Sequence, residues 1–283
     1  MKKINNTRAF TLVELLTVIS IIAVLLVLLI PALNQVANVG QKVRQTSQLT
    51  TISVALETFS NDFGQYPDSG NNDRDGEAYY GSQKLSEALL GYDMLGLNAD
   101  ALPQFDRDDD NNLYADDDGN VLNLDSRSGP YIEPDKINPV ESGNTQDALD
   151  LAEGGYYIAD VFKRDSAEYG MPVLYYRADT NNKLQRASGV ASVYDVSDSN
   201  VPFDTDNSNY SQFFNGLERP WEDPDGAISN QEVFSQYIKN ESISSADDSK
   251  IVPYRPQSFL LITAGKDGKF GTEDDITNFS QNQ

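Results

Sequence analysis

Carboxylates are the side chains of this sequence that could do chemistry, because it contains 44 Asp and Glu residues but no His and no Cys. Without a thiol or an imidazole, thiolate or His-ligated zinc sites and His-based catalytic triads are excluded. What remains are carboxylate, amide, hydroxyl and backbone carbonyl oxygens, which are the ligands that hard cations such as Ca2+ prefer. The composition therefore favours a cation site over a catalytic centre.

One concentration of such oxygens lies near the C-terminus, in residues 264–276 (AGKDGKFGTEDDI). Three glycines allow the chain to turn tightly, while Asp267, Glu273, Asp274 and Asp275 bring carboxylates together. Like charges in a tight loop repel one another, and a divalent cation reverses the sign of that interaction. A flexible loop that also supplies carbonyls suits Ca2+ better than Mg2+. The alternative is an acidic turn without a metal.

A second acidic cluster, in the middle of the chain, alternates its oxygens as the first ligands of a calcium loop do. Its members are Asp106, Asp108, Asp110 and Asn112. The glycine that follows is not at the position that an EF-hand requires, and no Glu follows at the twelfth position. These residues are a candidate second metal cluster, and a solvated acidic loop is the alternative.

Charge is unevenly distributed along the chain. The formal net charge is −23, of which residues 1–50 contribute +4 and residues 51–283 contribute −27. Such an acidic surface repels phosphate backbones, which excludes nucleic-acid binding by charge. The two parts of the chain are therefore expected to lie in different surroundings.

Residues 12–33 form an apolar stretch that is long enough to cross a bilayer as a helix. From Leu15 to Leu33 no residue is charged, and a helix of that length spans roughly 28 Å. Three basic residues precede the stretch, so the positive-inside rule predicts a cytoplasmic N-terminus and an exported remainder. A cleaved signal peptide and a simple anchor are alternatives, but neither explains Glu14, a carboxylate that is unfavourable in lipid.

Residues 8–16 (RAFTLVELL) resemble the class III leader of type IV pilins and type II secretion pseudopilins. The resemblance implies that a prepilin peptidase cuts between Ala9 and Phe10 and that the new amine of Phe10 is methylated. The family usually has Gly before the cut, where this chain has Ala9. Glu14 then becomes an assembly residue, because its carboxylate can pair with the Phe10 ammonium of a neighbouring subunit.

The C-terminal loop resembles the calcium loop of the G-type major pseudopilin of type II secretion. By that resemblance Asp267, Asp274 and Asp275 would bind Ca2+ through their side chains. Backbone carbonyls near Thr263 and Thr272 would complete the coordination shell. The two motifs together place the chain closest to the G-type subunit.

The elements that must position these residues fall into four segments. Residues 1–9 are the leader, and residues 10–63 are one long helix, with its membrane-spanning part at about 12–33 and its end at Gly64. Residues 64–155 are an acidic, loop-rich insertion with a short helix at 84–97. Residues 156–283 are the head. The helical core stripe is expected to comprise Val36, Val39, Val43, Ile52, Ala55, Leu56, Phe59 and Phe63.

Within the head, the β-branched and aromatic runs 156–162 and 173–177 are predicted to pair as a short antiparallel sheet. Residues 195–250 are predicted to be a surface insertion with a short helix at 231–238. A strand at 258–263 leads into the candidate calcium loop. The fold class is therefore α+β, with a long N-terminal helix and a C-terminal globular head that holds a small antiparallel sheet.

The resemblance implies a structural subunit and not an enzyme. The subunit would lie in the inner membrane with its head in the periplasm and, after processing, would polymerise into a homo-oligomeric filament for type II protein secretion. Its partners would be prepilin peptidase, other pseudopilins and the inner-membrane assembly platform. The alternatives are a type IV pilus pilin, major or minor, and a single-span membrane-anchored calcium-binding domain.

Overall fold

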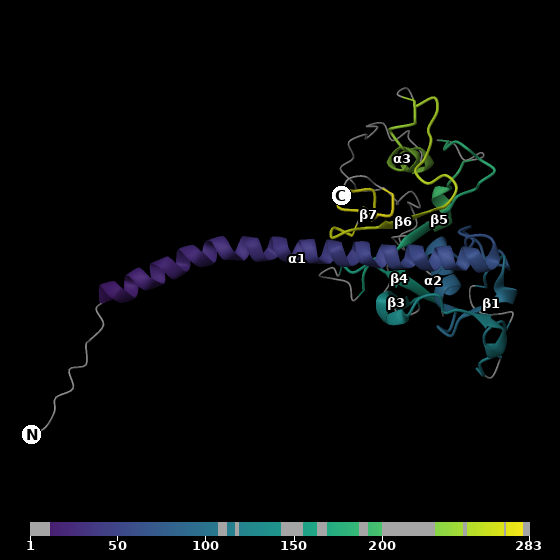
Figure 1. The fold of residues 1–283 in the computed structure, drawn as a ribbon, viewed down its shortest axis with the longest axis horizontal. Coiled ribbons are helices and arrows are strands. Elements are labelled where there is room, and N and C mark those ends of the chain that lie inside the picture. The colour runs from purple at the N-terminus through teal and green to yellow at the C-terminus, as the bar shows by residue number, and fades with distance from the viewer. Residues whose placement is uncertain are drawn as a thin grey trace, which may run out of the picture. The chain divides into compact units, whose positions relative to one another are not determined.

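The first element is α1, a helix of 52 residues from Leu12 to Phe63 (Figure 1). It is continuous through Pro31 and ends before Gly64, which has a φ of +75° and donates its N–H to Ser60 O at 2.8 Å. Glycine adopts positive φ without the steric cost that a Cβ imposes. Gly64 therefore ends the helix as a C-terminal cap.

The computed structural model describes residues 12–106, 112–116, 119–142, 155–162, 169–186, 192–199, 230–245, 248–268 and 270–279. The backbone divides into two compact units, residues 1–43 and residues 44–283. The division falls inside α1, so the helix belongs to both units.

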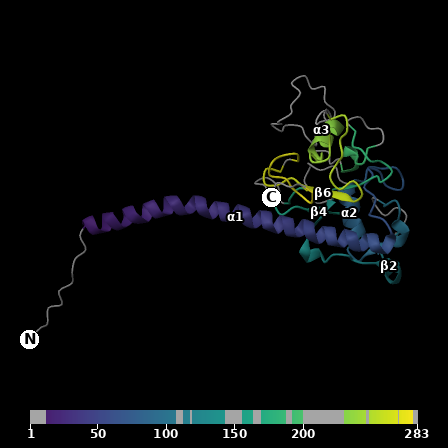
Figure 2. The same ribbon diagram turned by 45° about the horizontal axis from the view of Figure 1, so that its top comes forward.

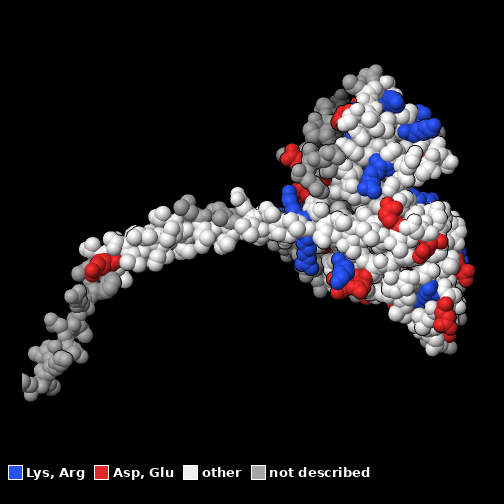
Figure 3. All heavy atoms as spheres, in the orientation of Figure 1, with Lys and Arg blue, Asp and Glu red and all other residues white. Residues whose placement is uncertain are grey.

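The first unit contains the apolar part of α1. Its large apolar side chains, as far as they are described between Leu12 and Leu33, are 47–77 % exposed in the single chain. Figure 3 shows this stretch almost without Lys, Arg, Asp or Glu on the visible face. Among the described residues, no helix reaches the length and apolarity required to cross a bilayer. The expected transmembrane segment at about 12–33 is thus not confirmed.

Three residues of the expected core stripe, Val36, Val39 and Val43, are also exposed. Their prediction as core residues is wrong for the single chain, because the described part of the first unit holds no second element that could cover them. The helical spacing identified their shared face correctly, but spacing does not say what packs against a face.

Most of the rest of the stripe lies in the hydrophobic core of the second unit, and Phe63 packs against that core while only partly buried. Ile52, Ala55, Leu56 and Phe59, together with Leu49 on the same face, are at most 3 % exposed. They recur three or four residues apart, so they share one face of the helix. This part of α1 therefore contributes one side of the hydrophobic core of the head.

Two side-chain amides fix α1 to the strand β4, Tyr156–Ala159. Gln48 Nε2 donates to Ala159 O at 2.9 Å, and Gln45 Oε1 accepts from Val161 N at 2.8 Å. Both glutamines are buried, so these hydrogen bonds satisfy polar groups that water cannot reach.

The central sheet has the order β5–β6–β7 and is antiparallel. Its strands are β5 (Leu174–Arg177), β6 (Phe259–Thr263) and β7 (Ile276–Thr277). Leu174 faces Ile262 and Arg177 faces Phe259 in the register of β5 and β6. Every residue of β6 is buried, which indicates that both faces of the sheet are covered.

The two faces of this sheet contact different helices. Tyr175, Phe259 and Leu261 share a core cluster with α1, whereas Tyr176, Leu260 and Ile262 share one with Phe234 of α3 (Asn230–Tyr237). The alternation follows from the two-residue period of a strand. In both Figure 1 and Figure 2, α3 lies on the far side of β6 from α1. The prediction of a helix in this region is correct, although α3 belongs to the core and not only to the surface.

The expected pairing of 156–162 with 173–177 is wrong for most of its length. β4 pairs with β3 (Asn138–Glu141), and β5 pairs with β6. The two segments meet at an isolated bridge between Ala159 and Pro172. Pro172 has no N–H to donate, which disfavours a longer ladder at this place.

Residues 64–142 contribute to the same head. The helix α2 spans Gly81–Leu90, so it begins three residues and ends seven residues earlier than predicted, with Gly91 as its C-cap. A Cβ at Gly91 would lie 2.1 Å from Gly96 O, so only glycine fits. Leu85, Leu89 and Leu90 of α2 share the core cluster of Ile52 and Leu56.

A further short antiparallel pair of strands consists of β1 (Leu97–Asn98) and β2 (Arg127–Ser128). The small antiparallel sheets beside a long helix confirm the α+β fold class.

Candidate functional site

The N-terminal candidate site comprises Ala9, Phe10 and Glu14. Ala9 and Phe10 lie outside the described residues. Glu14 is in the first turn of α1 and is exposed, with exposed apolar neighbours on both sides. A carboxylate in the first turn interacts favourably with the helix macrodipole. Glu14 is therefore an exposed acid among apolar side chains.

The C-terminal candidate site is the loop that joins β6 to β7. Thr263 pairs with Ile276, so the antiparallel ladder holds the two ends of the loop together. Gly265 has a φ of +61°, and a Cβ there would lie 2.4 Å from Asp274 O. The loop can close this tightly only because the position is glycine.

Within this loop the carboxylate of Asp274 accepts three hydrogen bonds. Its Oδ2 accepts from the backbone N–H of Lys266 at 2.7 Å and of Asp267 at 3.0 Å. Its Oδ1 accepts from Thr272 Oγ1 at 2.6 Å. The side chain of Asp274 thus connects the first part of the loop to its last part through hydrogen bonds.

The neighbouring carboxylate of Asp275 is held from two elements. Its Oδ2 accepts from Gly271 N at 2.7 Å and from the hydroxyl of Tyr237, at the end of α3, at 2.6 Å. Burial raises the pKa of Asp275 to about 7 and raises that of Tyr237 well above its usual value. A carboxylate in such a place is destabilised as an anion, and a positive charge beside it would offset this.

The loop brings only some of the five expected metal ligands together. Thr272 Oγ1 lies 3.3 Å from Asp275 Oδ1 as well as close to Asp274, so these two carboxylates converge. Asp267 contributes its N–H to the loop, and its side chain is exposed. Thr263 is fully buried and donates its hydroxyl to Ile276 O. Among the described residues no three acidic side chains are grouped closely enough to hold a metal. Ca2+ binding by Asp267, Asp274 and Asp275 stays a prediction.

Two of the four residues of the candidate second metal cluster lie outside the described residues. Asp108 and Asp110 belong to that undescribed part. Asp106 is fully buried, and Asn112 has a left-handed φ of +51°. The proposed role of this cluster stays untested.

Sequence reasoning missed Tyr237, which contacts the candidate loop from 38 residues away. No spacing in the sequence connects it to Asp275, because the contact depends on how α3 packs on the sheet. Its signal, a tyrosine near the end of a predicted helix, is too common to mark a site.

A comparison with protein-family profiles bears on the N-terminal site. Residues 4–30 match the prokaryotic N-terminal methylation motif. The matched range includes Ala9, Phe10 and Glu14, and the motif is a leader of the type IV pilin-like kind. It implies processing by prepilin peptidase and pilus-like assembly. Searches of curated proteins and of solved structures found no significant match.

Proposed function

We propose that this chain is a pilin-like structural subunit that prepilin peptidase processes and that then polymerises into a filament. The observation that carries the proposal is the methylation motif at residues 4–30, which includes most of the apolar part of α1. We assign the filament to type II protein secretion, as a pseudopilin of the G type, because of the acidic β6–β7 loop.

The exposed apolar surface of α1 supports assembly. Its described large apolar side chains from Leu12 to Leu33 are about half exposed or more in the single chain. Complete burial of a side chain of this size contributes roughly 2 kcal/mol. Together these side chains provide a large driving force for burying the apolar part of α1 away from water. In the proposal these residues are covered by inner-membrane lipid before assembly and by neighbouring subunits afterwards, while the head is periplasmic.

The acid at Glu14 supports a defined stagger between subunits. A carboxylate among apolar side chains is unfavourable unless a positive group pairs with it. Cleavage after Ala9 creates such a group, the ammonium of Phe10. A pair between Glu14 and the Phe10 ammonium of a neighbour would neutralise both charges and select one axial position.

Processing is tested by intact-mass spectrometry of the full chain co-expressed with a prepilin peptidase. We expect the loss of residues 1–9 and a methylated Phe10. Ala9→Lys should block the cut, because a long charged side chain replaces the small residue before it. Asn5→Lys adds the same charge to the leader and should be cut normally. An intact Met1 in the wild type contradicts the proposal and supports a single-span anchored calcium-binding domain.

Assembly is tested by electron microscopy of filaments from overexpressing cells. Glu14→Ala should be cut normally but form few or no filaments, whereas Gln41→Ala, at an exposed position of the same helix, should assemble as wild type. Wild-type filament levels with Glu14→Ala would contradict the role of Glu14. Filaments that form on the cell surface without a type II secretion machine would favour a type IV pilin, major or minor.

A second proposal concerns Ca2+ at the β6–β7 loop, held by Asp267, Asp274 and Asp275 with carbonyls near Thr263 and Thr272. It is supported by the convergence of Asp274 and Asp275 and by the unfavourable burial of Asp275 as an anion. The ion would have to replace some of the N–H donors that these carboxylates now accept from, and it would supply positive charge to a folded loop.

Calcium binding is tested by thermal unfolding of the full chain in nonionic detergent, with Ca2+ and with a chelator. We expect Ca2+ to raise the Tm of the wild type, and Asp274→Asn to remove this rise. Glu273→Gln, which removes an exposed acid of the same loop outside the ligand set, should keep it. An equal Tm with Ca2+ and with chelator would contradict a structural calcium site.

A further inference from the structure

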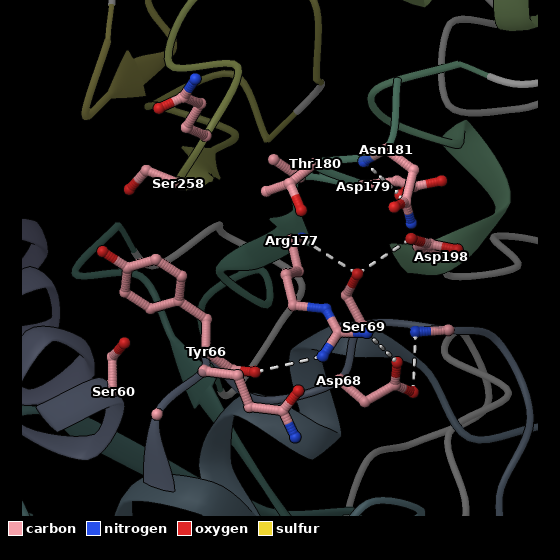
Figure 4. Close-up of a pocket in the computed structure, with 15 residues that line it drawn as sticks. Ser60, Tyr66, Asp68, Ser69, Arg177, Asp179, Thr180, Asn181, Asp198 and Ser258 are labelled. Carbon is pink, nitrogen blue, oxygen red and sulfur yellow. Dashed lines mark hydrogen bonds and ion pairs between the residues drawn. The ribbon is translucent and has the colours of Figure 1, made fainter. Parts of the chain in front are cut away.

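A polar cavity of about 630 Å³ lies at the C-terminal end of β5 (Figure 4). Four separate segments line it: the end of α1 with the loop to Gly70, residues 177–181, Asp198, and residues 257–258. Its volume lies in the range of small-molecule sites. Neither the proposed filament contacts nor the β6–β7 loop uses these residues.

Two cations stabilise one of the carboxylates at this cavity, Asp68. Lys84 is fully buried and donates from Nζ to Asp68 Oδ2 at 2.7 Å. Arg177 donates from Nη2 to Asp68 Oδ1 at 3.1 Å. Lys84 and Arg177 thus both direct their positive charge at the same acid.

Among the described residues, only neutral groups donate hydrogen bonds to the other two carboxylates that line the cavity. Asp198 Oδ2 accepts from Ser69 Oγ at 2.9 Å, and Ser69 Oγ accepts from Arg177 N. Asp179 accepts from the side-chain amides of Asn181 and Asn182. Neither acid forms a salt bridge with a described Lys or Arg. Figure 4 shows Asp179 and Asp198 on the same side of the cavity.

The environment of Asp198 shows that positive charge is lacking there. The pKa of Asp198 is raised to about 7, mainly by burial and also by the neighbouring Asp195 and Asp68, whereas Ser69 and Lys84 act in the opposite direction. Tyr176 also faces it from β5. In addition, the Oγ atom of Ser258 is buried and lines the same cavity beside the hydroxyl of Tyr66.

We propose that this cavity binds an organic cation, an alkylammonium or guanidinium group, through the carboxylates of Asp179 and Asp198. Such a group supplies both the missing charge and N–H donors for carboxylate and hydroxyl oxygens. The cavity is far larger than a metal ion, and among the described residues no three acids are grouped to ligate one. The cation is either a free small amine or a lysine or arginine side chain of a partner protein.

The test is a calorimetric titration of the full chain in nonionic detergent at roughly pH 8, with butylammonium as the probe. We expect a Kd on the order of 1 mM, as befits so small a ligand. Butanol has the same shape without the charge and should not bind. Equal binding of butanol, no binding of butylammonium, or displacement of butylammonium by Ca2+ at equal concentration would overturn the proposal.

Variants locate the binding. Asp198→Asn and Asp179→Asn should each weaken butylammonium at least ~10-fold. Asp135→Asn, which removes an exposed acid outside the cavity, should leave the affinity unchanged. Asp179 is exposed, so its variant is expected to fold even if Asp198→Asn does not, and circular dichroism checks both. Unchanged affinity in a folded Asp179→Asn variant would overturn the proposal.

An experiment with two peptides distinguishes between the two sources of the cation. A blocked tripeptide with a central lysine is compared with the same peptide containing norleucine. Binding of the lysine peptide in competition with butylammonium indicates that a protein side chain can enter. Binding of butylammonium without the lysine peptide assigns the cavity to free amines. In either case the affinity should fall on acidification to roughly pH 5, as Asp198 takes up a proton.

Discussion

A single buried lysine shows how strongly the head depends on individual polar contacts. Lys84 has no exposed surface, and its ammonium is held by Asp68 Oδ2 and by Asn72 O, both at 2.7 Å. Removing one partner of a buried pair leaves an uncompensated charge, which costs much more than the pair itself contributes.

We therefore predict that Lys84→Met lowers the free energy of unfolding by about 3 kcal/mol. Lys136→Met removes a lysine whose side chain is 56 % exposed and pairs with Glu133 and Asp135 at the surface. This control should change stability by less than ~0.5 kcal/mol. Denaturant unfolding followed by circular dichroism measures both. Equal effects of the two variants would contradict the structural role of Lys84.

The raised pKa of Asp198 predicts a pH dependence of stability. The folded state binds this proton with a pKa of about 7, whereas an unfolded Asp has a value of about 4. The folded state therefore holds more protons between these values, so Asp198 reduces stability as the pH rises through this window.

Asp198→Asn should accordingly flatten the decline in unfolding free energy from about pH 4 to about pH 7, by on the order of 2 kcal/mol. Asp275 has a similarly raised pKa, so part of the decline should remain. Asp135→Asn removes a carboxylate at an exposed position and serves as the charge-matched control. An identical slope in the wild type and in Asp198→Asn would show that Asp198 is ionised at low pH in the folded protein.

For single residues, the sequence indicated which side chains could bind a ligand better than it indicated which residues they contact. Asp274 and Asp275 could be named as candidate ligands because glycines and acids share one short segment, and that role stays a prediction. Lys84 and Asp198 could not be named, because their contacts with Asp68 and Ser69 join segments that are distant in the chain. Burial of a charged residue depends on such long-range partners, and no local pattern contains them.

Among the elements, α1 divides into faces with very different tolerance to change. Ile52 is fully buried against the sheet and α2, and Val54, two residues later, is 62 % exposed. Ile52→Ala should lower the free energy of unfolding by about 2–5 kcal/mol, because it leaves a cavity. Val54→Ala should change it by less than ~0.5 kcal/mol. Thermal unfolding measures both, and similar losses would mean that the second half of α1 is packed on all sides.

The turn between β6 and β7 depends on glycine for two separable reasons. Gly265→Ala meets both an unfavourable φ and a clash, since its Cβ would lie 2.4 Å from Asp274 O. Gly76→Ala has a similar φ of +88° but no atom within 4 Å of the added Cβ. We expect a loss of about 1 kcal/mol for Gly76→Ala and clearly more for Gly265→Ala, measured by denaturant unfolding. Equal losses would contradict the close approach of Asp274.

Element identities were predictable to different degrees. The long apolar run and Gly64 were enough to predict α1 and its end. The partner of β4 was not predictable, because β3 is only four residues long and contains Pro139, which strands disfavour. Strand pairing depends on contacts between distant segments, whereas helices depend mainly on neighbours in the sequence.

For the whole molecule, the net negative charge is the property that most affects its behaviour in solution. The chain carries −23, and loss of residues 1–9 would remove three basic residues and bring it to −26. Mutual repulsion of this size keeps acidic surfaces apart in solution. We predict a minimum of solubility close to the sequence pI of about 4.1, measured by light scattering during acidification in nonionic detergent. Constant scattering through that pH would show that charge does not limit self-association.

The hydrogen bonds of Gln45 and Gln48 to the end of β4 have a mechanical consequence. They join one turn of α1 to a strand end, beside the apolar face that begins at Leu49. A tension along α1 therefore loads both amides and the apolar contacts together, and they cannot fail one after another as the pairs of a zipper do. The head should accordingly remain attached under pulling until its core itself yields.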